Sequence, residues 1–156
     1  METFLVVFGL LATCFALSKI VPGLRVRAMR SLAARRGFQY IGGPLPASFR
    51  MTSYPADDLR FVRNVIEGQS NGMPILIFDC DVGVVGIARG RTCTFIATQT
   101  DTNPFGSLGW GERIVQSSGW SALYRLPPLF PSRPWTMGIR RIEDHLDSLR
   151  MCERAH

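Results

Sequence analysis

Two apolar segments joined by Asn71 and Gly72 constrain the fold most strongly. Asn-Gly is a frequent two-residue hairpin turn, because both central residues of a type I′ turn need positive φ. The flanking segments, 61–69 and 73–81, are rich in β-branched and aromatic residues, which favour strands. The pattern therefore predicts an antiparallel hairpin centred on this turn.

A third apolar segment, 91–99, follows a glycine-punctuated loop and extends the hairpin into a sheet. A symmetric register predicts four cross-strand pairs: Ile66–Ile77, Asn64–Asp79, Phe78–Phe95 and Cys80–Cys93. One face then presents Val65, Leu76, Phe78, Phe95 and Ala97, and the other presents Ile66, Ile75, Ile77 and Ile96. Because both faces are apolar at the middle strand, we expect that strand to be central and covered on both sides.

Helices and short strands are predicted around this sheet. Apolar residues at spacings of three and four predict a helix over 24–36, ended by Gly37, and an amphipathic helix over 137–151. Short strands are expected at 112–116 and 120–125. The predicted fold class is α+β, with an antiparallel, possibly closed and barrel-like sheet of five or more strands and a C-terminal amphipathic helix.

The N-terminal residues 3–21 form an apolar run whose one charge is Lys19. As a helix this run would be roughly 28 Å long, close to the thickness of a bilayer core. We therefore expect residues 1–23 to be an uncleaved transmembrane signal anchor. Residues 24–156 would form a single α+β domain that begins with a basic juxtamembrane helix, 24–36. The alternative is signal cleavage near Ser18, which would export the domain.

The charge of the chain is unevenly distributed, with 18 Lys+Arg against 12 Asp+Glu overall. The excess lies within residues 19–56, so the positive-inside rule predicts a single-pass inner-membrane protein with its N-terminus outside and its domain cytoplasmic. The lipid bilayer and its anionic headgroups are the expected partners of the basic cluster: Lys19, Arg25, Arg27, Arg30, Arg35 and Arg36. No nucleic-acid partner is expected, because the rest of the chain shows no basic stripe or known motif.

Polar residues in the core strands and on the last helix are the candidates for chemistry: Asp79, Asp81, Cys80, Cys93 and His145. Strand alternation points the two aspartates away from Cys80, which disfavours one shared metal site. The chain shows no nucleophile–base, Walker or metal-ligand spacing. We therefore assign no catalytic residue, no metal ligand and no cofactor.

Two of these groups carry structural expectations. Asp79 is expected to be hydrogen-bonded by Asn64 and Thr94, its neighbours in the proposed register. Cys80 and Cys93 are expected to be free buried thiols in a cytoplasmic domain, whereas an exported domain would favour a disulfide between them.

Several segments carry a resemblance: 34–38 (ARRGF), 64–68 (NVIEG), 78–81 (FDCD), the threonine-rich 92–100, and 119–125 followed by 135–143. Together with a short N-terminal apolar span, they resemble a group of small bacterial membrane-anchored proteins of unknown function. The resemblance implies a strand that carries tryptophan before a closing helix. It implies no catalytic residue.

The leading functional hypothesis is a non-catalytic interaction or scaffold domain, held at the cytoplasmic face of the inner membrane and bound to a protein partner. The alternative is an enzyme or small-ligand-binding domain with a pocket near Asp79, Asp81 and His145. That alternative needs these groups within about 3–4 Å of a common point in a concave site.

Overall fold

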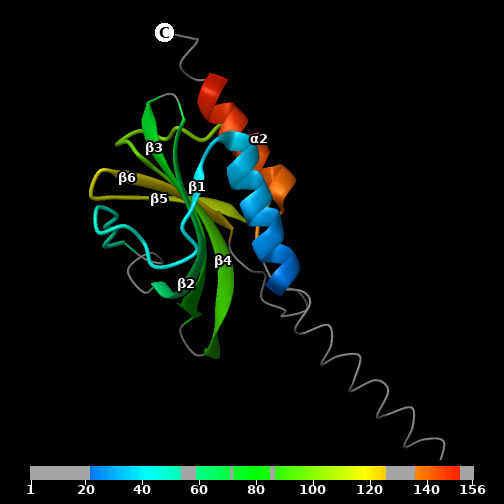
Figure 1. Cartoon of the computed structure of the whole chain (residues 1–156). Coiled ribbons are helices and arrows are strands. Elements are labelled where there is room, and N and C mark those ends of the chain that lie inside the picture. The colour runs from blue at the N-terminus through cyan, green and yellow to red at the C-terminus, as the bar shows by residue number, and fades with distance from the viewer. Residues whose placement is uncertain (1–21, 54–58, 71, 85–86, 126–135, 152–156) are drawn as a thin grey trace, which may run out of the picture.

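The computed structural model describes residues 22–53, 59–70, 72–84, 87–125 and 136–151. These residues form an α+β fold with one open antiparallel sheet and two helices (Figure 1). The N-terminal helix is described from residue 22 to residue 36. The six strands lie in the order β1-β2-β3-β4-β6-β5. The bounds of the other elements are β1 Gln39–Tyr40, β2 Leu59–Ser70, β3 Met73–Val84, β4 Ile87–Gln99, β5 Glu112–Ser117, β6 Trp120–Arg125 and α2 Ile139–Met151.

The central hairpin, β2–β3, has the two-residue turn that the sequence predicts, because Ser70 pairs directly with Met73. The strand pairing confirms three of the four predicted pairs: Ile66–Ile77, Phe78–Phe95 and Cys80–Cys93. The second short hairpin, β5–β6, turns through Ser118 and Gly119, which both have positive φ. Local turn chemistry therefore fixes the register of both hairpins.

The predicted pairing of Asn64 with Asp79 is wrong by one residue, since Arg63 is the strand partner of Asp79. The register shifts twice in β2, between Arg60 and Arg63 and between Arg63 and Ile66. Asn64 itself has a φ of 55°. Bulges of this kind add a residue to one strand and turn its side chains relative to the partner strand.

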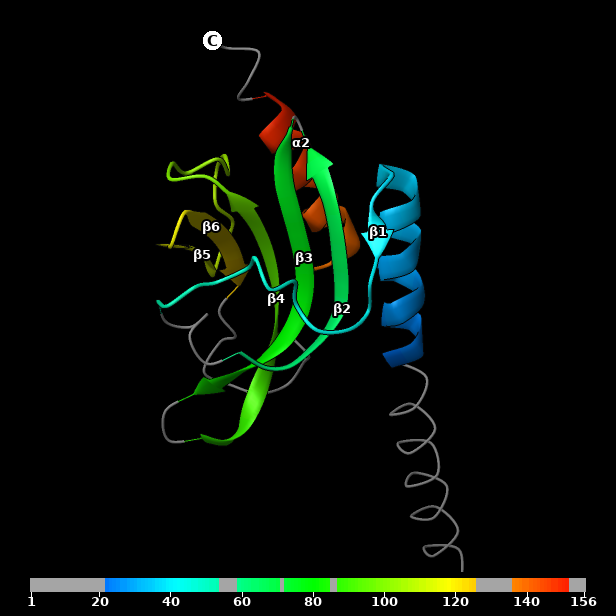
Figure 2. The same ribbon diagram turned by 60° about the vertical axis from the view of Figure 1, so that its left-hand side comes forward.

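Two apolar layers cover the two faces of the sheet, as predicted for the middle strand. On one face, the N-terminal helix and α2 lie side by side (Figure 2) and bury a cluster that includes Met29, Leu32, Ile66, Ile77, Ile96, Ile142 and Leu146. On the other face, the segment 41–53 crosses the sheet and packs Phe49 and Met51 onto Val65, Leu76, Phe78, Phe95 and Ala97. The predicted assignment of residues to the two faces is confirmed.

The expectation of a transmembrane anchor must be corrected. Among the residues that the structure describes, no helix has both the length and the apolarity needed to cross a bilayer. The prediction of a single-pass inner-membrane protein is therefore not supported, and the described residues form an α+β fold. Residues 3–21, on which the anchor and the cleavage site near Ser18 were predicted, lie outside the described residues. The sheet is open rather than barrel-like.

Gly68 of β2 provides a stability prediction. The ring of Phe38 packs directly on its backbone, so that a Cβ atom at this position would overlap the ring. We expect Gly68→Ala to lower the free energy of unfolding by about 1–3 kcal/mol, the usual range for overpacking a core. Urea denaturation measures this change. Gly43→Ala is the control, because a Cβ there meets no atom within 4 Å. Equal stability of the two variants would contradict the packing.

Candidate functional site

Asp79 lies at the centre of a buried network between the N-terminal helix and the sheet. Its carboxylate accepts hydrogen bonds from Arg25 Nε and Nη2, both at 2.9 Å, from Asn64 Nδ2 at 3.0 Å and from Thr94 Oγ1 at 2.6 Å. Arg25 Nη1 also donates to the carbonyl oxygen of Met137 at 2.9 Å. The predicted hydrogen bonds from Asn64 and Thr94 are confirmed. A buried carboxylate with this set of partners is satisfied, so this Arg25–Asp79 network holds the helix on the sheet.

Asp81 belongs to a separate polar group nearer the surface. Its Oδ1 atom accepts hydrogen bonds from Thr92 Oγ1 at 2.6 Å and from Arg63 Nη2 at 3.0 Å. Arg63 Nη2 also donates to Thr92 Oγ1 at 2.7 Å. A hollow of about 490 Å³ borders both this group and Asp79. Asn64, Asp79, Arg63 and Thr92, which line the hollow, each take part in these hydrogen bonds within the domain.

His145 packs in a different cluster, with Glu112, Arg141 and Gly109. Arg141 Nε and Nη2 donate to the two carboxylate oxygens of Glu112, both at 2.8 Å, and the amide of Gly109 donates to Oε2. His145 Nε2 lies 3.2 Å from Glu112 Oε1, but without the geometry of a hydrogen bond. Arg141 is the main cause that lowers the pKa of Glu112 to about 2. This Glu112 cluster was not predicted.

The structure does not bring the predicted catalytic candidates together. Asp79 lies on β3, whereas His145 contacts Glu112 of β5, and β4 and β6 lie between these two strands. Three strand spacings amount to roughly 14 Å. His145 is also not among the residues that line the hollow beside Asp79. The condition set for the enzyme alternative, a common point near Asp79, Asp81 and His145, is not met.

The two predicted cysteines are thiols that face each other across β3 and β4 and form no disulfide. Cys80 is fully buried and Cys93 is 2% exposed. Burial raises the pKa of the Cys80 thiol far above its ordinary value. The thiolate is the form that acts as a nucleophile or metal ligand, so Cys80 is an inert core residue. Within the described part of the chain, no three His, Cys, Asp or Glu residues gather as a metal site would require.

The predicted basic cluster is largely paired within the domain. Besides Arg25, Arg35 lies 2.9 Å from Glu143 and Arg36 lies 2.6 Å from Asp147, both on α2. Arg30 lies over the ring of Tyr40, 5.1 Å from its centroid. Arg27 is exposed, and Lys19 lies outside the described residues. Arg25, Arg35 and Arg36 thus join the N-terminal helix to the rest of the fold.

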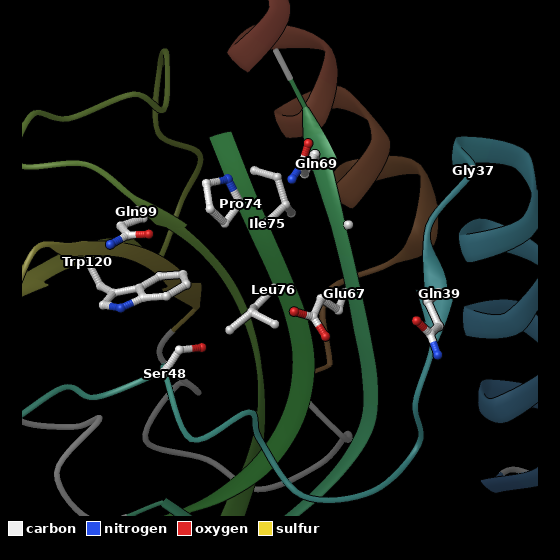
Figure 3. Close-up of a pocket in the computed structure, with 11 residues that line it drawn as sticks. Gly37, Gln39, Ser48, Glu67, Gln69, Pro74, Ile75, Leu76, Gln99 and Trp120 are labelled. Atoms are coloured by element: carbon white, nitrogen blue, oxygen red, sulfur yellow. The ribbon is translucent and has the colours of Figure 1, made fainter. Parts of the chain in front are cut away.

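An open groove of about 580 Å³ lies on the face of the sheet that the segment 41–53 covers only in part (Figure 3). Cross-strand pairs place Gln39, Glu67 and Leu76 in one row, and Gln69 beside Pro74 and Gln99 beside Trp120 in the next. Ser48, on the segment 41–53, forms one wall. Leu76 and Trp120 provide an apolar base, and a polar rim is formed by Gln39, Ser48, Glu67, Gln69 and Gln99.

The polar side chains of this sheet groove have no partners in the described part of the chain. Glu67, Gln69 and Gln99 are exposed, and among the described residues no hydrogen bond or ion pair engages their side chains. In contrast, the carboxylates of Asp79 and Glu112 accept hydrogen bonds from arginine side chains. Unpartnered polar groups in a hollow are available to a ligand, so this groove is the candidate binding site.

The sequence contains a signal for this groove that was not used. The predicted face with Val65, Leu76 and Ala97 continues, two residues further along each strand, to Glu67, Pro74 and Gln99. Side chains two residues apart share a face. The change from Val65 to Glu67 on β2 and from Ala97 to Gln99 on β4 marks the edge of the covered part of that face.

Comparisons with known proteins found no match to this chain among protein-family models, curated proteins or solved structures. They therefore do not bear on the resemblance to small bacterial membrane-anchored proteins.

Proposed function

We propose that this protein is a non-catalytic binding domain that holds a short extended segment of a protein partner in its sheet groove. The observation that carries the proposal is the set of exposed, unpartnered side chains in the groove, Glu67, Gln69 and Gln99. The acidic groups that catalysis could use, Asp79 and Glu112, are held by arginines instead.

The dimensions of the groove suit a peptide. From Gln39 on β1 to Gln99 on β4, the rim of the groove crosses three strand spacings, which span roughly 14 Å. An extended chain covers this length with about four residues, at roughly 3.3 Å per residue. Carboxamides such as Gln39, Gln69 and Gln99 offer both donors and acceptors, which match the N–H and C=O groups of a peptide backbone.

A sugar ligand fits the groove less well. Sugar rings commonly stack on the exposed face of an aromatic side chain, but Trp120 at the base of the groove is only 5% exposed. Hydrogen bonds at the rim, rather than stacking, must therefore supply most of the specificity. A contact of this size is small for a protein interface, so we expect a dissociation constant of about 1–100 µM.

Selection from a displayed random octapeptide library on the full chain tests the proposal. Gln69→Trp serves for counter-selection, because an aromatic residue suits an exposed strand position and would fill the groove. Selected peptides should bind Gln69→Trp at least tenfold more weakly than the unchanged chain. Arg113→Trp is the matched control, since Arg113 is an exposed strand residue outside the groove.

A second filling variant, Gln99→Trp on β4, guards against a folding defect in the first one. Urea midpoints close to that of the unchanged chain establish that each variant is folded. Peptides that bind both filled variants as tightly as the unchanged chain would refute the proposal. Failure to enrich any peptide that competes for the groove would refute it equally.

A further inference from the structure

We infer that the sheet groove selects a segment with a positively charged side chain, which binds to the carboxylate of Glu67. This inference rests on the proposed function and names the chemistry of the partner. Glu67 is the one residue with a formal charge among the groove-lining residues. Among the described residues, no lysine or arginine lines the groove.

The position of Glu67 suits a charged group that enters the groove. In Figure 3, its carboxylate lies between Leu76 and Gln39, which flank it as strand neighbours. The carboxamide oxygens of Gln39 and Gln69 can accept the guanidinium N–H groups that the carboxylate does not bind.

The free state of Glu67 distinguishes it from the other acids on the strands of the sheet. Asp79, Asp81 and Glu112 each pair with an arginine, whereas Glu67 has no hydrogen-bond or ion-pair partner among the described residues. An anionic ligand would meet this carboxylate without a compensating cation. Charge complementarity therefore favours a basic segment over an acidic or neutral one.

Four pools of octapeptides test the inference. The pools share random flanks and differ at one fixed central position, which holds arginine, lysine, citrulline or glutamate. Citrulline keeps the shape of arginine without its charge. Binding to the full chain is measured by fluorescence polarisation at low and at physiological salt. The arginine pool should bind about tenfold more tightly than the citrulline pool, as expected for a hydrogen bond to a charged group.

Variants of Glu67 assign this preference to its carboxylate. In Glu67→Gln, the affinities of the arginine and citrulline pools should differ by less than about twofold. Glu67→Arg should favour the glutamate pool over the arginine pool. Glu143→Gln, which removes an acid outside the groove, should leave the preference for arginine unchanged. Raising the salt concentration should weaken the binding of the arginine pool more than the binding of the citrulline pool.

The outcomes separate this inference from the proposed function. Equal binding of the arginine and citrulline pools, with binding still lost in Gln69→Trp, would overturn the inference and leave a peptide groove. A preference for arginine that persists in Glu67→Gln would also overturn it. A different outcome is self-association of the unchanged chain through the groove. If Glu67→Gln abolished that self-association, a second copy of the chain would be the occupant, and the inference would be overturned. Absence of binding in every pool would count against the groove itself.

Discussion

Replacing Arg25 by alanine should lower the free energy of unfolding by about 3–5 kcal/mol, the cost of leaving a buried charge without its partner. The side chain of Asp79 is 1% exposed and receives two of its four hydrogen bonds from Arg25. The loss also removes the contact between the N-terminal helix and the carbonyl of Met137. Urea denaturation followed by circular dichroism measures the change.

Two further variants make this result specific. Arg27→Ala is the matched control on the same helix, because Arg27 is exposed. It should change the stability by less than about 0.5 kcal/mol. The double variant Arg25→Met/Asp79→Asn should recover more than half of the loss, since it removes both charges together. Equal stability of Arg25→Ala and Arg27→Ala would contradict the network.

Acidification should destabilise the fold through Glu112 as the pH falls from about 4.5 to about 2. Its ordinary pKa is 4.5, and the hydrogen bonds from Arg141 are the main cause that lowers it to about 2. A depressed carboxylate pKa contributes stability above its ordinary value, which is lost as the pH falls through the lowered value. This pKa difference corresponds to about 3 kcal/mol. Urea midpoints measured across this pH range test the prediction.

Variants of the same cluster provide its control. Glu112→Gln removes the titrating group, so its stability should depend less steeply on pH between about 4.5 and 2 than that of the unchanged chain. Arg141→Met removes the main cause of the lowered pKa and should flatten the same part of the profile. Parallel profiles for the unchanged chain and Glu112→Gln would show that Glu112 does not contribute in this way.

The sheet could be predicted in detail because its signals are local. Asn71-Gly72 set the register of the central hairpin, and alternation then assigned Ile66, Ile77 and Phe78 to their faces. The amphipathic pattern of the last helix likewise matches α2, whose Ile142 and Leu146 are buried. The error at Asn64 comes from bulges, which depend on a positive φ that no common turn motif announced.

The polar clusters could not be predicted, because their members are far apart in the sequence. Arg25 and Asp79 are 54 positions apart, and Glu112 and Arg141 are 29 apart. The sequence does not show which residues the N-terminal helix packs against, so it predicts that the arginines of this helix, beside an apolar run, form a membrane-surface cluster. In the structure, Arg25 instead bonds Asp79 and Arg35 pairs with Glu143. The same lack of tertiary information left the groove around Glu67 unrecognised.

The sheet groove should bind a ligand, while the buried polar clusters only stabilise the fold. Backbone amide shifts of the ¹⁵N-labelled full chain, titrated with a selected octapeptide, test it most directly. The largest shifts should fall at residues 67–69, 75–76 and 99, which line the groove. Largest shifts at Asp79 or Glu112, with little change at Glu67 and Gln69, would contradict it.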